Sequence, residues 1–336
     1  MEKFYSNEEM RTKSKLKVLI TSRPYEDLEC SFENFPKNAC MRLGGDEKSD
    51  QIREEIDLVI DVEVKDLTKT FNDRTSAAEK IEARPKDMEH RTYLWLYLTL
   101  NYIKDERAVY SKTSSVEQLL SHLPSNVADA YESMLSRDGD EPVKKILLHL
   151  VLAAERPLTL LEANIALTLA LQEQVMDSHV DVMDGTWSLL SFERVVKRYC
   201  GLFISMHDSN LSFIHQTARD FLLIKREGGD MGWGGSFNLQ QSHETMLQVC
   251  LDYLLIPDIG GPESTMGDLR DRPYPFLEYS GNYWPSHMVK HGLALSGNNL
   301  NRVRMLCDPG SRHLRIWTFA YDDVFWIRRS NSNWTL

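Results

Sequence analysis

Histidine and cysteine are the residue types in this sequence best suited to metal binding and to acid–base or nucleophilic chemistry. The ten histidines of the 336-residue chain are scattered, and no H-E-x-x-H helix or G-x-S-x-G elbow occurs. The five cysteines are widely spaced and include no C-x-x-C pair: Cys30, Cys40, Cys200, Cys250 and Cys307. We therefore expect no zinc site, no disulfide framework and no catalytic site, and the cysteine pattern favours a cytosolic protein with reduced thiols.

Nucleotide phosphates are commonly held by a G-x-x-x-x-G-K-[ST] loop, whose backbone amides and lysine contact the β- and γ-phosphates. No such loop occurs in the sequence. The Gly-rich stretch Gly228–Gly235 follows no strand and precedes no G-K-[ST], so a surface loop is expected there. Residues 1–15 alone precede the first predicted strand, and they offer no acidic strand end to hold Mg²⁺. We expect no enzyme activity and no bound cofactor for this chain.

The elements of the N-terminal third begin with the apolar run Leu16–Thr21, which ends at Ser22-Arg23-Pro24. This run predicts a buried strand at the carboxyl edge of a parallel sheet. Apolar residues at positions 52, 56, 59 and 60 then predict a helix. A charged, Ala-rich surface helix is expected over Asp66–Asp87. A buried helix is expected over Tyr93–Leu100, which is apolar almost all round.

Residues 123–227 follow the order of a winged helix. Apolar spacing predicts helices that begin near Pro124 and near Val143. A turn around Arg156–Thr159 is expected to start a further helix through Ala170, and a fourth helix is expected over 188–198. A hairpin comes next, with strands 201–206 and 211–215 joined by the turn His207–Asn210. Thr217 and Asp220 match the cap pattern S/T-x-x-D/E of the following helix. The last three of these helices, followed by the hairpin, predict a winged helix.

The C-terminal third is expected to be helical. An amphipathic helix is predicted by five apolar positions with helical spacing: Met246, Val249, Cys250, Tyr253 and Leu254. A long polar loop is expected over Gly260–Pro275, and an aromatic cluster from Phe276 to Trp284 begins the last clear helical unit. Residues 295–336 show no recognisable pattern.

Three stretches, taken in order, resemble the fungal NACHT proteins, a class of STAND signalling ATPases. Lys17–Pro24 (KVLITSRP) resembles the sensor 1 strand that closes their nucleotide-binding domain. Leu123–Arg137 (LPSNVADAYESMLSR) resembles the helix that leads into their winged helix. Phe213–Leu222 (FIHQTARDFL) resembles the end of that winged helix, a type also found in a GPI inositol-deacylase. Pro275–Tyr279, followed by Tyr283-Trp284, is similar to the lead-in that precedes ankyrin repeats.

The resemblance spans residues 15–290 and implies a mainly α chain in four parts. Residues 1–48 would be the residual α/β edge of a P-loop NTPase domain, with the sensor 1 strand and its exit loop. A helical domain would follow over 49–122, a winged-helix domain with a β-hairpin over 123–227, and a helical C-terminal region over 228–336. The chain is therefore expected to lack the ATP-hydrolysing front half and to end before any ankyrin repeats.

Arg23 holds the position of the sensor 1 arginine, which in the family faces the nucleotide γ-phosphate from a strand end. A guanidinium suits this contact because it is always charged and can donate two N–H bonds to phosphate oxygens. The alternative is a structural arginine paired with Glu26 or Asp27. ATP or ADP with Mg²⁺ is the cofactor of an intact family member, whereas in this chain Arg23 would be vestigial without a phosphate loop.

His215 holds the position of the nucleotide-sensing histidine, which in the resting family members contacts the ADP β-phosphate. An imidazole N–H donor, or a cationic ring, suits a contact with phosphate. The alternative is a histidine that hydrogen-bonds the backbone at a strand–helix corner. Met206-His207-Asp208 spells the plant and animal form of this motif, but its place in the predicted hairpin turn makes it a coincidence. The adenine-contacting G-x-P motif of other STAND families has no counterpart in His90–Trp95.

Charge and hydropathy limit the partners of the chain. The net charge of −11 argues against broad nucleic-acid binding, and no apolar run is long enough to cross a membrane. The polar N-terminus predicts no secretory signal peptide. A DNA-binding winged helix is the alternative function, with Arg194, Lys197 and Arg198 as its phosphate contacts. Three cations on one helix are too few to outweigh the acidic chain.

The resemblance implies a cytoplasmic, non-catalytic regulatory fragment of a STAND signalling ATPase. The expected role is protein–protein interaction in fungal self/non-self recognition or programmed cell death. The partner could be a nucleotide-binding domain supplied by another chain.

Overall fold

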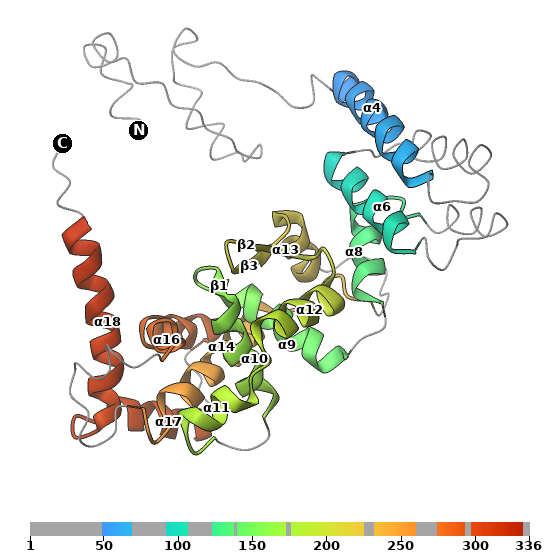
Figure 1. Ribbon diagram of the computed structural model, residues 1–336. Helices are drawn as coiled ribbons and strands as arrows, with labels where there is room; N and C mark the ends of the chain where they lie inside the picture. The colour runs from blue at the N-terminus through green and yellow to red at the C-terminus, as the bar shows by residue number, and fades with distance from the viewer. Residues whose placement is uncertain are drawn as a thin grey trace, which may run out of the picture. The chain divides into compact units, whose positions relative to one another are not determined.

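A computed structural model describes residues 49–68, 92–106, 123–137, 140–172, 176–224, 232–259, 274–292 and 297–331. These residues form a mainly helical chain with one small antiparallel sheet (Figure 1). The predicted strand Leu16–Thr21, Arg23, most of the predicted helix Asp66–Asp87 and residues 260–273 lie outside the described residues. The chain divides into two compact units, residues 1–59 and 60–336, and the first described helix, α4 (Ser49–Thr68), runs across their boundary.

Helix α6 (Tyr93–Glu106) confirms the helix predicted over Tyr93–Leu100, but not its burial all round. Thr92 begins it, because its hydroxyl accepts the Trp95 N–H at 3.1 Å. Trp95 is fully buried, whereas Tyr93 and Tyr97 are 48% and 47% exposed. The Trp95 indole also donates to the Pro124 carbonyl at 2.9 Å, which joins α6 to the start of the next described helix. One face of α6 is therefore buried and the other carries tyrosines in contact with solvent.

The next two helices, α8 (Val127–Leu135) and α9 (Glu141–Ala153), lie where the apolar spacing places them. Asn126 and Asp140 cap them by accepting backbone N–H groups of the first turn, at 2.9 and 3.3 Å. Their apolar stripes face the core, as predicted, with buried residues that include Tyr131, Met134, Leu147, Leu150 and Val151. The helices therefore form because a polar cap precedes an apolar stripe of helical period.

Helices α10 (Leu160–Leu171), α11 (His179–Gly185) and α12 (Leu189–Cys200) follow, and α11 has no counterpart among the predicted elements. A capping box begins α10: the Glu162 N–H donates to the Thr159 hydroxyl at 3.1 Å, and the Glu162 carboxylate accepts the Thr159 N–H at 2.8 Å. Ser188 caps α12, which buries Phe192, Val196 and Cys200.

The sheet has three strands rather than the two of the predicted hairpin. β2 (Ile204–His207) and β3 (Asn210–Phe213) are antiparallel, and β1 (Leu158–Thr159), predicted as a turn, pairs with the free side of β3. The strand order is therefore β1-β3-β2. The turn is shorter than predicted: Asp208 and Ser209 alone form it, with φ of 49° and 60°. Positive φ at both central residues matches a type I′ turn, whose twist suits a tight hairpin.

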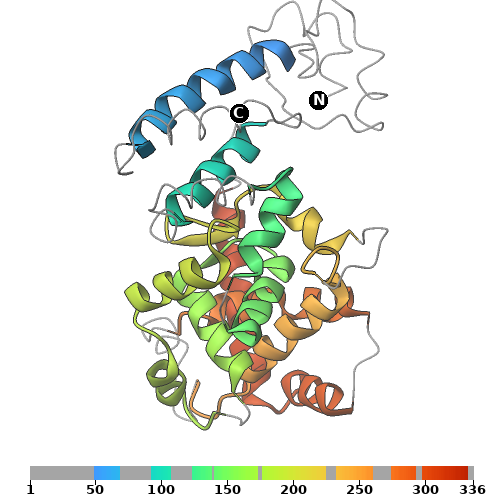
Figure 2. The same cartoon turned by 90° about the vertical axis from the view of Figure 1, so that its right-hand side faces the viewer.

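Five helices complete the described chain: α13 (Gln216–Leu223), α14 (Leu239–Leu254), α16 (Leu277–His291), α17 (Gly297–Cys307) and α18 (Arg312–Asn331). Helix α14 buries all five positions predicted for its apolar face. It packs against α9, α10 and α16, so one hydrophobic core continues from the sheet region into the C-terminal helices (Figure 2). Helices α17 and α18 lie in the stretch where no pattern was recognised. At Gly281, an added Cβ would lie 2.8 Å from the Ala320 Cβ, so glycine permits the close approach of α16 and α18.

The described end of the Gly-rich stretch is packed, not a surface loop as predicted. Trp233 is 9% exposed, and its backbone N–H donates to both Glu132 carboxylate oxygens, at 2.9 and 3.0 Å. The Gly234 N–H adds a third bond to Glu132 at 3.2 Å. An added Cβ at Gly232 would lie 2.6 Å from the same carboxylate. The glycines therefore allow the backbone to close around the half-buried Glu132 carboxylate of α8.

No helix among the described residues is both long enough and apolar enough to span a membrane.

Candidate functional site

His215 lies at the corner between β3 and α13, and it is itself the N-cap of α13. Its backbone is extended (φ −155°, ψ 157°), and its Nδ1 accepts the Thr217 N–H at 3.3 Å. The Thr217 hydroxyl lies 3.0 Å from the same nitrogen. The prediction that Thr217 caps this helix is therefore wrong, because the helix begins at Gln216 and Thr217 is already within its first turn. This geometry matches the alternative interpretation of His215, which is a histidine that hydrogen-bonds the backbone at a strand–helix corner.

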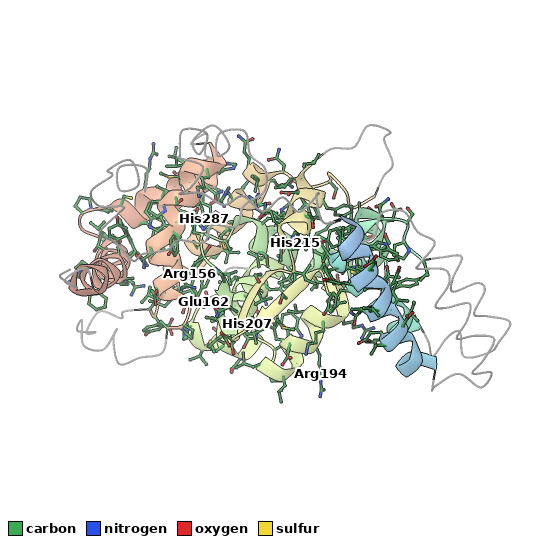
Figure 3. The ribbon with its side chains drawn as sticks, turned by 90° about the horizontal axis from the view of Figure 1, so that it is seen from above. Arg156, Glu162, Arg194, His207, His215 and His287 are labelled. Atoms are coloured by element: carbon green, nitrogen blue, oxygen red, sulfur yellow. The ribbon has the colours of Figure 1, made fainter. Side chains whose placement is uncertain are left out.

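The proton of the neutral His215 ring lies on Nε2, because Nδ1 accepts a backbone N–H and so must offer its lone pair. Among the described residues, Nε2 makes no hydrogen bond, and the side chain is exposed (Figure 3). His215 thus presents an N–H donor to solvent in an orientation fixed by the start of α13. Such a donor can bind a phosphate or carboxylate oxygen.

Tyr131 connects this corner to the core. Its hydroxyl lies 3.0 Å from the Thr217 hydroxyl, and its ring is 1% exposed and packs edge-on against Phe203 at 5.0 Å between centroids. Burial raises the pKa of Tyr131, and the hydrogen bond to Thr217 partly opposes that rise. The Tyr131 hydroxyl is therefore neutral at pH 7. A chain of hydrogen bonds runs from α8 through Thr217 to the exposed imidazole of His215.

Of the two predicted nucleotide-sensing residues, the structure describes His215, whereas Arg23 lies outside the described residues. Its role, like the sensor 1 strand around it, stays a prediction. Met206 and His207 lie in β2 and Asp208 in the turn, so the literal Met206-His207-Asp208 sequence marks the end of a hairpin. The His207 Nδ1 lies 3.0 Å from an Asp208 carboxylate oxygen, and both side chains are more than four-fifths exposed.

The cations considered for DNA binding are exposed on α12, and Figure 3 shows Arg194 pointing away from the helix. Lys197 is held by Glu193 on the same helix at 2.6 Å. The Arg198 guanidinium lies 6.0 Å from the centre of the Tyr199 ring. Because Lys197 is already paired, this face offers a weak electrostatic attraction for a phosphate backbone.

Two cysteines of the described chain, Cys200 and Cys250, are buried free thiols. Burial raises the pKa of the Cys200 thiol to about 12 and that of Cys250 still higher. Neither sulfur is therefore a thiolate near pH 7, and neither can act as a nucleophile there.

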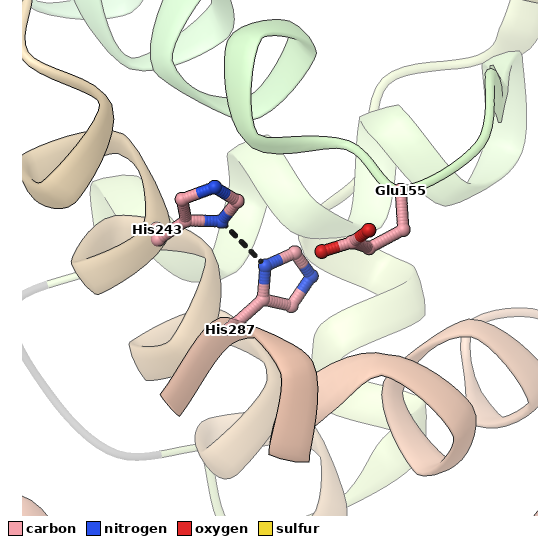
Figure 4. A group of neighbouring side chains, drawn as sticks. All are labelled: Glu155, His243 and His287. Carbon is pink, nitrogen blue, oxygen red and sulfur yellow. Dashed lines mark hydrogen bonds between the residues drawn. The ribbon is translucent and has the colours of Figure 1, made fainter. Parts of the chain in front are cut away.

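A buried polar cluster joins α14, α16 and the segment after α9 (Figure 4). The Nδ1 atoms of His243 and His287 lie 3.0 Å apart, and the Tyr279 hydroxyl lies 3.2 Å from the other ring nitrogen of His287. The same hydroxyl accepts the Glu155 N–H at 3.1 Å. Sequence reasoning missed this cluster, because its members come from three distant segments and match no spacing motif.

Hydrogen bonds and burial shift the pKa values of the three ionisable side chains Glu155, His243 and His287. The Glu155 carboxylate accepts a hydrogen bond from Ser286 at 2.8 Å and two from the Lys290 ammonium, both at 2.7 Å. These bonds outweigh the effect of burial and lower the pKa of Glu155. Burial, with the adjacent His243 ring, lowers the pKa of His287 to about 3, and burial also lowers the pKa of His243. Both rings are therefore neutral at pH 7, beside an ionised carboxylate.

The depressed pKa of His287 predicts acid-sensitive stability. The folded chain binds a proton at His287 only near pH 3, whereas the unfolded chain binds it near pH 6.5. The stabilisation is therefore complete above pH 6.5 and is lost progressively as the pH falls toward 3. Between pH 7 and pH 5, His287 alone should lower the free energy of unfolding by about 2 kcal/mol. Urea denaturation with a chelator present, at both pH values, measures the change.

The matched variant is His287→Gln, which keeps a polar side chain but cannot titrate in this range. Its loss of stability between pH 7 and pH 5 should be smaller than that of the wild type by about the same 2 kcal/mol. Equal losses in the two proteins would contradict the assignment. His149, His179 and His313, whose pKa values burial also lowers, add acid sensitivity of the same sign to both proteins.

Comparison with known proteins finds a fungal relative. The chain is 27% identical over 215 residues to the vegetative incompatibility protein HET-E-1 of Podospora anserina. The matched region covers 63% of this chain but 14% of that protein, so the chain spans a small part of its relative's length. The similarity supports the relation to the fungal NACHT class that the motifs indicated. No protein-family model matches the chain, and no solved structure matches it significantly.

Proposed function

We propose that this chain is a non-catalytic regulatory part of a STAND (NACHT) signalling ATPase, and that it works in the cytoplasm through protein contacts. Its role would lie in fungal self/non-self recognition or programmed cell death. The single observation that carries the proposal is the placement of His215: the family's sensing position coincides with an exposed, oriented N–H donor. The similarity to a fungal incompatibility protein supports the same role.

The proposal includes a winged helix built from α9, β1, α10, α12, β2 and β3. In its support, α9, α10 and α12 pack on one another and the sheet has the order β1-β3-β2. His215 directly follows β3, so its position depends on the register between β3 and β2. Phe213 pairs with Ile204 at that end of the hairpin, which fixes the register two residues before His215.

In the proposed resting state, the Nε2–H of His215 donates to the β-phosphate of ADP held in a nucleotide-binding domain on another chain. The sequence contains no G-x-x-x-x-G-K-[ST] loop, so the phosphates would be held by that partner. Thr217 and Tyr131 are positioning residues, because they orient the imidazole without reaching the nucleotide. Loss of ADP would then release the winged helix from the nucleotide domain.

A two-chain binding experiment tests this proposal. The purified chain is titrated into a separately produced NACHT nucleotide-binding domain loaded with Mg-ADP, and the affinity is measured by calorimetry. We expect His215→Ala to weaken the complex by about tenfold, because one hydrogen bond to a charged oxygen is lost. Thr217→Val should weaken it less, since the donor remains but is no longer held by the Thr217 hydroxyl.

The matched control is His207→Ala, which removes an exposed histidine eight residues away on β2 and should leave the affinity unchanged. Equal affinities of the wild type and His215→Ala for the ADP-loaded domain would overturn the proposed role of His215. No complex with the wild type would overturn the proposal that a nucleotide domain is the partner.

A further inference from the structure

Three side chains that could bind a metal ion converge where α14, α16 and the segment after α9 meet. His243 comes from α14, His287 from α16, and Glu155 from the segment between α9 and β1 (Figure 4). One ligand atom of each lies within 4.8 Å of the other two. His243 is 8% exposed and His287 is fully buried. The three segments are brought together by the packing of α14 on α9 and α16, so the core itself holds the ligand atoms in place.

Two imidazole nitrogens and one carboxylate oxygen are a donor set that suits Zn²⁺ and similar first-row transition metals better than Mg²⁺ or Ca²⁺. Two nitrogens bound tetrahedrally to one zinc at about 2.05 Å would lie about 3.3 Å apart. The observed separation of the two Nδ1 atoms is 3.0 Å, so an opening of a few tenths of an ångström admits the ion. We propose that Glu155, His243 and His287 bind one Zn²⁺, with a water as fourth ligand.

Each neutral imidazole ring has one nitrogen with a free lone pair, so His243 and His287 can both bind the metal without releasing a proton. One of the two Nδ1 atoms carries a proton in the hydrogen bond between the rings. When the metal binds, that proton moves to Nε2 of the same ring, and each ring stays neutral. The Tyr279 oxygen lies 3.2 Å from His287 Nε2 and can accept its N–H. Such an outer hydrogen bond is the usual means by which proteins orient a metal-binding histidine.

Lys290 is the internal competitor for this site. Its ammonium contacts both Glu155 oxygens, yet its side chain is 48% exposed and can extend into solvent. Zn²⁺ would replace one positive charge by two beside the same carboxylate, while Ser286 continues to donate to Glu155. The bound ion would cross-link α14, α16 and the segment before β1. This inference does not depend on the nucleotide-related function proposed above.

The test uses the full chain without a metal-binding tag, stripped with a chelator and dialysed. Zn²⁺ is titrated by calorimetry, and Co²⁺ is added separately to follow the visible absorption of a tetrahedral site. We expect one Zn²⁺ per chain and a higher melting temperature when it is bound. His243→Gln should weaken zinc binding by at least tenfold, and the matched variant His207→Gln, at an exposed histidine, should leave it unchanged.

Lys290→Gln provides a test that does not depend on removing a buried ligand. It leaves all three ligands in place and removes the competing ammonium, so zinc affinity should rise by about tenfold. Absence of binding in both the wild type and Lys290→Gln would overturn the proposal. Zinc binding as tight in His243→Gln as in the wild type would also overturn the proposal, because the metal would then lie elsewhere. An affinity that Lys290→Gln leaves unchanged would overturn it for the same reason.

Discussion

Replacing Arg156 by Met is expected to lower the free energy of unfolding by about 3 kcal/mol. The guanidinium donates two hydrogen bonds to the Glu162 carboxylate, at 2.9 and 2.6 Å, and lies over the Tyr279 ring. The Glu162 side chain is only 6% exposed, so the substitution leaves a buried carboxylate without its counter-charge. Removing one partner of a buried ion pair costs more than the pair itself contributes, because the other charge remains desolvated.

The double variant Arg156→Met/Glu162→Gln is the control for this prediction. The amide introduced by Glu162→Gln would be neutral, and its carbonyl could still accept the Thr159 N–H that begins α10. Most of the lost stability should therefore return, with an interaction energy of about 2 kcal/mol in the double-mutant cycle. Urea denaturation of the four proteins measures this. A double variant as unstable as Arg156→Met would show that the uncompensated charge is not the cause.

Phe203→Ala should destabilise the chain by about 3–5 kcal/mol, the usual cost of removing a buried aromatic side chain. Phe203 is fully buried, and its ring packs against Tyr131 at 5.0 Å and Phe213 at 5.8 Å between centroids. Its N–H and carbonyl also bond the chain on both sides, at Cys200 and Ile214. The substitution would open a cavity where α8, the hairpin and α13 meet.

Leu190→Ala is the matched control, because Leu190 is a large apolar residue that is 71% exposed on α12. It should change stability by less than about 0.5 kcal/mol. The Phe203 variant should also loosen the Tyr131–Thr217 contact, and thereby increase amide hydrogen exchange at the start of α13. Normal exchange at Thr217, together with a small loss of stability, would contradict the role given to this aromatic cluster.

The sequence predicts the described helices best where a cap precedes an apolar stripe. Asp140 before α9 and Ser188 before α12 are such cases, and both helices are confirmed. It fails for β1, because a two-residue strand has too few side chains to show alternation and exists through its pairing with β3. It also missed α17 and α18, although half of the residues of α18 are apolar and its buried residues Ile316 and Ala320 have helical spacing.

The candidate sites were predictable to different degrees. His215 could be singled out because it lies within a local motif, and the corner between β3 and α13 was expected from the hairpin. The role of His215 as the N-cap could not be predicted, because Thr217 fits the preferred cap pattern better. The Glu155–His243–His287 cluster could not be predicted at all. His243 and His287 are 44 residues apart, and only the packing of α14 on α16 brings them together.

A non-catalytic module that meets nucleotide only through a partner should not bind nucleotide by itself. Calorimetric titration of the purified chain alone with Mg-ADP and Mg-ATP measures this without any assumption about the partner. We expect no detectable binding at millimolar nucleotide, because the sequence contains no phosphate-binding loop. Micromolar binding that is lost in Arg23→Ala or His215→Ala would contradict the proposal, and would show that this chain forms a nucleotide switch by itself.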